Sequence, residues 1–211
     1  MTLQLTKKHN FDIVFDSQKV FRLILEAMSN PSRVVNIREY AIKLLGDYPS
    51  FTGKQPSVIY TADNPVFLTI AMTLLDNEVS FNTCENQYLS DEIVSLTLSR
   101  REKVDSADFI FVCDTKDIKN VIENVKCGTL SDPHKSATVI IKNDNEIDCR
   151  LNLSGPGING FIESHVTQTV KDTIILRDAQ NYEYPQGIDL IFVSSDGKLF
   201  AIPRLIRMEV E

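Results

Sequence analysis

The sequence contains no tryptophan and few of the residues that bind metals or form disulfides. Its 211 residues include four cysteines and three histidines. The cysteines form no CxxC pair, and the histidines form no HExxH or other local metal-binding pattern. We therefore expect neither a zinc motif nor a disulfide framework, and the scattered cysteines favour a reduced, cytoplasmic location.

Long apolar runs and clustered basic charge are also missing. No segment has about 18 uninterrupted apolar residues, and residues 1–10 lack the apolar core of a secretory signal. Acidic side chains outnumber basic ones by 29 to 22, which gives a net charge of -7. We therefore expect neither a membrane nor a nucleic acid as a partner. The nearest basic cluster, Arg100-Arg101, is interpreted as a solvated helix end because acidic residues flank it.

The familiar catalytic motifs are absent as well. There is no phosphate-binding GxxxxGK[ST] loop, no GxGxxG turn and no GxSxG nucleophile elbow. Carboxylates are plentiful, but spacing alone places no pair of them in one pocket, so no general acid and base can be assigned. No lysine stands out as the Schiff-base residue of a free-standing pyridoxal-phosphate enzyme. The motifs thus assign no catalytic residue, no metal ligand and no cofactor.

What the sequence does contain is an alternation of helical and extended patterns. This alternation predicts one α/β domain spanning residues 1–211. Helices are expected at 17–28, 63–75, 90–98 and 117–125, and strands at 33–37, 79–83, 107–113, 137–141, 150–153, 188–193 and 198–202. The last two strands are expected to form a hairpin, residues 166–175 fit either a helix or a strand, and residues 46–56 are expected to be an exposed loop.

The first expected helix has one apolar face that can dock on a core. Its apolar residues at helical spacing are Val20, Phe21, Ile24, Leu25 and Met28. Arg22, on the same helix, is either a ligand-binding arm or part of a salt bridge on the helix face, and we favour the salt bridge.

Five residues near the C-terminus are candidates for a binding site or an interface. Gly155 and Gly157 lie in a turn after an expected strand, and Gly187 precedes Asp189, which interrupts an apolar strand. A buried carboxylate at position 189 needs a partner such as Arg204, although capping of a local turn is an equally good reading. Arg204 follows a proline, where an arginine can bind a phosphate or carboxylate ligand, pair inside an interface, or simply face solvent.

The order and spacing of several blocks resemble the PhnH family, a subunit of the bacterial carbon-phosphorus lyase system. The blocks are VFRLILEAMSNP at 20–31, LLDN at 74–77, LNLSGPGI at 151–158, YPQGIDLI at 184–191 and AIPR at 201–204. Two departures from the family pattern are Leu205-Ile206, where the family usually has two threonines, and Ser32, where glycine is common.

The resemblance implies a fold, an oligomeric state and membership of a multisubunit complex. The fold is a three-layer α/β/α sandwich with a mixed central sheet, similar to the large domain of pyridoxal-phosphate-dependent transferases but without the cofactor-binding lysine. The family forms homodimers and belongs to a core complex with subunits G, I and J. That complex acts in the breakdown of organic phosphonates, in which the phosphonate is first joined to the ribose of ATP with loss of adenine.

Two hypotheses follow for the function. In the first, the chain is an accessory subunit of this complex and holds no active site of its own. In the second, it is a stand-alone binding protein or enzyme, with a cleft near Gly155, Gly157, Asp189 and Arg204 that takes a phosphonate, ATP or a phosphoribosyl compound.

Overall fold

The computed structural model describes residues 9–45 and 64–209, so the loop expected at 46–56 lies outside the described residues. Ten strands form two sheets within this part of the chain. The seven-stranded sheet has the order β1 (Val35–Asn36), β9 (Lys198–Ile202), β8 (Asp189–Val193), β5 (Thr138–Lys142), β4 (Phe109–Val112), β2 (Ser80–Asn82) and β3 (Arg100–Arg101). The small sheet has the order β10 (Arg207–Glu209), β6 (Cys149–Ser154) and β7 (Ile162–Val166).

The large sheet is mixed, as expected. Its strands β3, β2, β4, β5 and β8 pair in parallel, whereas β9 pairs antiparallel with both β8 and β1. The pairing of β8 with β9 confirms the hairpin expected from the sequence. The small sheet is entirely antiparallel. The α/β class is therefore correct.

Side chains on the central strands alternate between two apolar cores, one on each face of the large sheet. On β8, Leu190 and Phe192 face one core while Ile191 and Val193 face the other. The core that contains Ile191 is completed by α1 (Phe15–Ser29), α2 (Arg38–Leu44), α3 (Asn64–Leu74) and α4 (Gln87–Thr97). The core that contains Phe192 is completed by α5 (Ile118–Asn124), α6 (Gln168–Asp178) and the small sheet. Strands buried on both sides explain the continuous apolar runs of the sequence.

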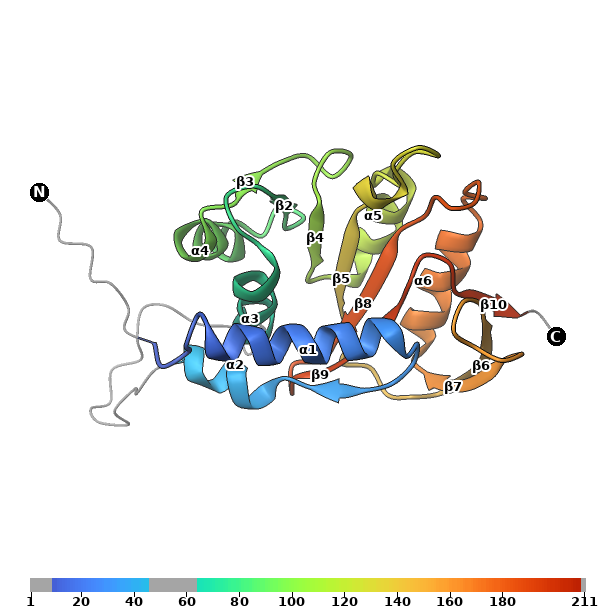
Figure 1. Ribbon diagram of the computed structural model, residues 1–211, viewed down its shortest axis with the longest axis horizontal. Helices are drawn as coiled ribbons and strands as arrows, with labels where there is room; N and C mark the ends of the chain where they lie inside the picture. The colour runs from blue at the N-terminus through green and yellow to red at the C-terminus, as the bar shows by residue number, and fades with distance from the viewer. Residues whose placement is uncertain (1–8, 46–63, 210–211) are drawn as a thin grey trace, which may run out of the picture.

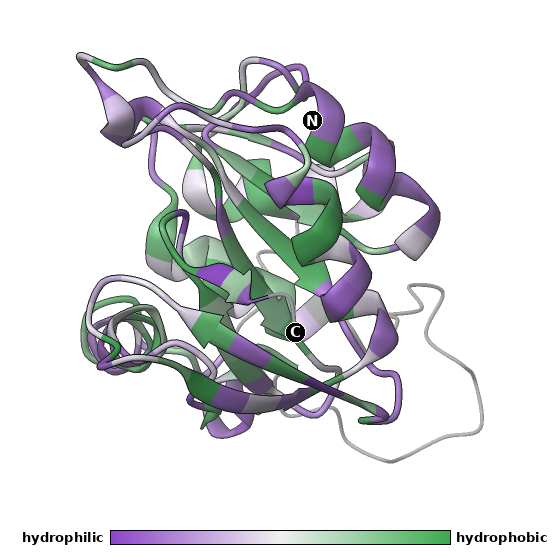
Figure 2. Ribbon diagram, turned by 90° about the vertical axis from the view of Figure 1, so that its right-hand side faces the viewer, coloured by the Kyte–Doolittle hydropathy of each residue, from purple (hydrophilic) through white to green (hydrophobic). Residues whose placement is uncertain are grey.

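The small sheet lies at one end of the molecule. In Figure 1 it is at the C-terminal end, at the opposite end from α4 and β3. Figure 2 shows hydrophobic residues on the strands in the interior and hydrophilic residues along the outward sides of the helices. Among the described residues, no helix is both long enough and apolar enough to cross a bilayer.

Several expected boundaries differ from the structure for local reasons. Helix α4 begins three residues earlier than predicted, because the Asn86 side chain caps it by accepting a hydrogen bond of 3.1 Å from the Leu89 amide. The pair Arg100-Arg101 is exposed but is not a helix end. Leu98 takes a left-handed conformation that ends α4, and the chain then pairs with β2 as the short strand β3.

Residues 166–175 hold both of the structures that the sequence allowed. Val166 ends β7, and Thr167 then caps α6 by accepting a hydrogen bond from the Val170 amide. Among the α-helices and strands, three more were not predicted, namely α2, β7 and β10. They are short, and β7 and β10 are largely exposed on one or both faces, so apolar periodicity alone gives little signal.

The prediction of which residues of α1 dock on the core is partly wrong. Val20 and Ile24 are buried, but Phe21 and Leu25 point outward, with exposed fractions of 48% and 52%. The inner side of the helix is completed instead by Ala27, against α3 and β9. The five apolar residues cover more of the helix circumference than one contact face can bury, so the packing partners decide which of them are inside.

Candidate functional site

Polar segments follow four parallel strands at the same edge of the large sheet. They are 83–86 after β2, 113–117 after β4, 143–145 after β5 and 194–196 after β8. The chain leaves β2 for α4 on one face and leaves β4 for α5 on the other face. A crevice at such a reversal, beyond the carboxyl ends of the strands, is where open α/β sheets bind ligands.

A hollow of about 760 Å³ occupies this position, and we call it the carboxyl-end crevice. Its charged lining residues are four carboxylates and two ammonium groups, contributed by Glu85, Asp114, Asp117, Asp144, Lys116 and Lys142. Lys116 pairs with Asp114 at 3.0 Å, and Lys142 pairs with Asp144 at 3.3 Å. Because negative charge predominates and both ammonium groups are already paired, the crevice is poorly suited to a bare phosphate or phosphonate group.

Two cysteines, Cys84 and Cys113, also line the carboxyl-end crevice. Burial, and then the negative charge of Asp117, raise the pKa of Cys84 to about 12. Since the thiolate is the reactive form, Cys84 is a weak nucleophile at neutral pH. Within the described ranges, no group of three or more His, Cys, Asp or Glu side chains is arranged to hold a metal ion.

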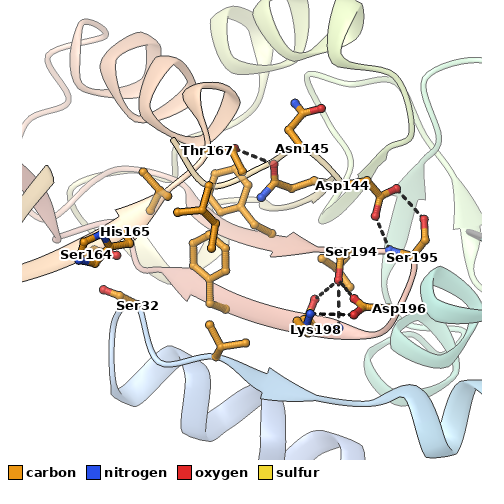
Figure 3. Close-up of a pocket in the computed structure, with 17 residues that line it drawn as sticks. Ser32, Asp144, Asn145, Ser164, His165, Thr167, Ser194, Ser195, Asp196 and Lys198 are labelled. Carbon is orange, nitrogen blue, oxygen red and sulfur yellow. Dashed lines mark hydrogen bonds and ion pairs between the residues drawn. The ribbon is translucent and has the colours of Figure 1, made fainter. Parts of the chain in front are cut away.

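A second hollow of about 390 Å³, the inter-sheet cavity, lies between β8 and β9 of the large sheet and β7 of the small sheet (Figure 3). The rings of Phe192 and Phe200 contribute to its lining and stack on each other, with centroids 5.2 Å apart and planes inclined by 20°. Val166, Ile147 and Val34 add aliphatic surface. The two hollows share Asp144 and Asn145, which follow β5.

The carboxylates beside the inter-sheet cavity are held by neighbouring donors, as Figure 3 shows. Asp144 accepts hydrogen bonds of 2.6 Å from both the amide and the hydroxyl of Ser195. Burial would raise the pKa of Asp144, but these bonds and Lys142 lower it further than burial raises it. The hydrogen bond from Ser194, followed by that from Lys198, lowers the pKa of Asp196 to about 2. Both groups therefore remain ionised at neutral pH and are poor proton donors.

At the opposite end of the inter-sheet cavity lie the hydroxyl groups of Ser32 and Ser164 (Figure 3). Ser164 is on the inward side of β7 and is 6% exposed. The buried Ser32 Oγ has no hydrogen-bond partner within the described residues. Ser32 also has a φ of 67°, a left-handed conformation that is rare outside glycine. His165, the residue after Ser164, pairs through Nε2 with Glu163 at 3.2 Å.

The structure brings together Asp189 and Arg204, two of the candidates from the sequence. Arg204 Nη2 lies 2.7 Å from Asp189 Oδ2, and the Arg204 amide donates to Asp189 Oδ1 at 2.8 Å. Arg204 Nη1 also donates to the carbonyl of Pro133. The pair connects the start of β8 to the segment after β9, and neither residue lines the inter-sheet cavity or the carboxyl-end crevice.

Two of the candidate glycines pack against that same segment after β9. A Cβ atom at Gly155 would lie 2.7 Å from the Leu205 carbonyl oxygen, and one at Gly187 would lie 3.1 Å from Arg204 Cβ. Both have positive φ, so their role in the structure is close backbone packing in a conformation that favours glycine. Gly157 is apart from them: a Cβ atom there would have no neighbour within 4 Å, and the residue lines a different hollow beside Ser32.

Arg22 lies on the exposed side of α1, away from both hollows. Among the described residues, no ion pair is formed by Arg22. The neighbouring carboxylate at helical spacing, Glu26, pairs instead with Arg33 at 2.6 Å. The structure therefore does not bring Arg22 to the other candidates.

The residues that line the two hollows were not singled out from the sequence, although a signal was available. Asn143, Asp144 and Asn145 follow one expected strand after Lys142, and Ser194, Ser195 and Asp196 directly follow another. Polar runs at the ends of apolar strands mark the ligand-binding edge of an α/β sheet. Using that signal requires knowing that the strands are parallel, which local patterns do not reveal.

Comparison with known proteins agrees with the resemblance carried by the sequence blocks. The family model of a bacterial phosphonate metabolism protein, PhnH, matches residues 9–209, which is nearly the whole chain. No curated protein matches the sequence significantly. The matched region contains both hollows, the Asp189–Arg204 pair and every described helix and strand. The chain therefore belongs to the PhnH family and takes part in bacterial phosphonate metabolism.

Proposed function

We propose that this chain is an accessory, non-catalytic subunit of the carbon-phosphorus lyase core complex. It acts in the cytoplasm and assembles with subunits G, I and J, which carry the chemistry. The observation that carries the proposal is the family match over residues 9–209. The finer features of the fold belong to the same proposal: a three-layer α/β/α sandwich similar to the large domain of pyridoxal-phosphate-dependent transferases, and a homodimer in isolation.

An uncovered apolar surface on α1 supports the subunit role. Val14, at the start of the helix, is followed seven and eleven residues later by Phe21 and Leu25, a spacing that places all three on one side. Their exposed fractions are 70%, 48% and 52%. We call these three residues the α1 stripe. An exposed apolar stripe at this spacing is typical of a helix that packs against a protein partner.

The Asp189–Arg204 pair has a structural role in this proposal. Asp189 is nearly buried, and its two oxygens accept from the backbone and the guanidinium of Arg204, whose Nη1 donates to the Pro133 carbonyl. Groups that satisfy each other in this way offer little to a ligand. This arrangement favours the accessory subunit over a stand-alone enzyme with a phosphonate cleft at these residues.

The proposal predicts the outcome of a co-purification. The tagged chain, expressed with subunits G, I and J, is expected to elute as one stoichiometric complex whose mass includes all four. Phe21→Glu with Leu25→Glu places two charges on the α1 stripe and is expected to reduce recovery of the partners at least tenfold. The matched control is Ile175→Glu, at an exposed apolar position on α6.

Equal recovery with the stripe variant and the control would remove α1 from the interface but leave the subunit role standing. If the unaltered chain stays separate while G, I and J assemble without it, the accessory-subunit proposal is wrong. Circular dichroism of each variant distinguishes a lost interface from a lost fold.

A further inference from the structure

The inter-sheet cavity combines an apolar body with polar groups at its ends. Phe192, Phe200 and Val166 contribute rings and aliphatic carbon from β8, β9 and β7, and Ile147 lies at the opening with an exposed fraction of 68%. A volume of about 390 Å³ lies in the range of cavities that hold small molecules. Stacked aromatic rings and branched aliphatic side chains are the surfaces against which a flat ring packs well.

Charge in the lining argues for an uncharged occupant. Each Asp and Lys side chain that lines the cavity already has an opposite charge nearby. Asp144 pairs with Lys142 at 3.3 Å and Asp196 pairs with Lys198 at 2.9 Å. His165 Nε2 lies 3.2 Å from a carboxylate oxygen of Glu163. An anion or cation entering this space would lose hydration without gaining a free counter-charge, which is unfavourable.

The two hydroxyl groups at one end supply the polar contacts. The Ser32 Oγ is buried without a partner in the described part of the chain, and Ser164 is nearly buried while facing the same cavity (Figure 3). Each hydroxyl can donate one hydrogen bond and accept others. Ser32 is further held in a left-handed conformation, and local backbone strain is often concentrated at functional sites.

We propose that the inter-sheet cavity binds an uncharged aromatic compound that carries a carbonyl, an amide or a ring nitrogen at one edge. The ring packs among Phe200, Val166 and Ile147, and its polar edge bonds to the hydroxyls of Ser32 and Ser164. This site is separate from the α1 stripe, so it stands or falls independently of the accessory-subunit role.

The test uses benzamide and benzoate, which have nearly the same shape and differ in charge. Binding to the full chain is measured by nuclear magnetic resonance titration. We expect benzamide to bind at millimolar concentration and to shift signals of Ile147, Val166 and Phe200. Benzoate is expected to bind at least fivefold more weakly, because the cavity offers its carboxylate no free positive charge.

Variants locate the contacts. Ser164→Ala removes one hydrogen-bonding group and is expected to weaken benzamide binding about fivefold. Ile147→Asp brings a charge to the opening and is expected to weaken binding at least as much. Leu130→Asp is the control, since Leu130 is an exposed apolar residue outside the cavity.

Ser32→Gly separates ligand binding from structural support. It removes the hydroxyl and also places glycine where φ is 67°, so the midpoint of thermal unfolding should stay the same or rise while benzamide binding weakens. Three outcomes would each overturn the proposal. The first is that benzoate binds as tightly as benzamide, and the second is that benzamide does not bind. The third is that the folded Ser164→Ala and Ser32→Gly variants bind benzamide as tightly as the unaltered chain does.

Discussion

At the scale of single residues, two glycines show how the same backbone angle can carry different constraints. Gly157 and Gly197 both have a φ of +84°. A Cβ atom at Gly157 would meet nothing within 4 Å, whereas one at Gly197 would lie 2.6 Å from the Arg38 amide nitrogen. Gly197 ends the turn between β8 and β9, so this contact sets how closely that turn approaches the start of α2.

We predict that Gly197→Ala is the more damaging of the two substitutions. Gly157→Ala should lower the free energy of unfolding by about 1 kcal/mol, from the left-handed conformation alone. Gly197→Ala should cost roughly 1–3 kcal/mol more, because the backbone of Arg38 must move. Urea denaturation of both variants measures the difference. Equal losses of unfolding free energy in the two variants would show that the close contact between Gly197 and the Arg38 backbone is not a constraint.

At the scale of elements, a buried arginine connects α6 to the chain after β9. Arg177 is fully buried near the end of α6. Its Nη1 donates to the carbonyls of Ile202 and Pro203 at 3.4 and 3.3 Å, its Nη2 donates to the Ile206 carbonyl, and its Nε donates to Asp178 at 3.0 Å. A planar guanidinium can serve these divergent acceptors at once, which an ammonium group cannot.

Arg177→Met is therefore expected to lower the free energy of unfolding by about 3 kcal/mol or more, since the carbonyls of Ile202, Pro203 and Ile206 each lose a buried, charged donor. Arg150→Met serves as the control because Arg150 is exposed on β6 with only a 4.0 Å ion pair, and its effect should stay within about 0.5 kcal/mol. Thermal and urea unfolding measure both. A loss below about 1 kcal/mol for Arg177→Met would mean that the segment after β9 is held mainly by other contacts.

At the scale of the whole molecule, aspartates with lowered pKa values join separate elements. Burial would raise the pKa of Asp16, but a 2.7 Å ion pair with Lys43 and the Asp12 amide lower it overall, and this pair joins α1 to α2. Burial would also raise the pKa of Asp108, but hydrogen bonds from Lys126 and Ser80 lower it overall. Asp144 joins the segment after β5 to Ser195 after β8, whereas Asp196 holds the turn between β8 and β9 through Ser194 and Lys198.

These shifts predict the direction of acid sensitivity. Each carboxyl has a lower pKa in the folded protein than its ordinary value of 3.8, so the unfolded chain takes up protons first as the pH falls. The stabilisation from these groups is complete above about pH 5. It is lost as the pH falls through 3.8 and then through the folded pKa values, which reach about 2 for Asp196.

Urea unfolding at pH 7, 5 and 3 tests this expectation. The Asp108→Asn variant measures the contribution of one of these carboxylates. It should have a lower free energy of unfolding at pH 7, and that free energy should decrease less between pH 5 and pH 3 than in the unaltered chain. A free energy of unfolding that does not change down to pH 3 would contradict the prediction.

The sequence alone determined the α/β class, the β8–β9 hairpin and the family. Apolar runs of strand length such as Phe109–Val112 are typical of strands buried on both faces, and the glycine-containing blocks are local patterns with characteristic order. The sequence also suggested a partner such as Arg204 for Asp189, because a carboxylate in an apolar strand is costly unless it is paired, but it left capping of a local turn equally open, and the structure shows the pair.

Only the tertiary structure decided which surfaces meet. Local patterns did not show that Phe21 and Leu25 lie outside while Val20 lies inside, because that depends on where α3 and the sheet touch the helix. Local patterns also did not show that Ser32 and Ser164 line the same cavity, since the two residues are brought together only when the small sheet packs against the large one. Periodicity specifies which residues share a side of an element, whereas the packing of distant elements determines which side is buried and where a cavity remains.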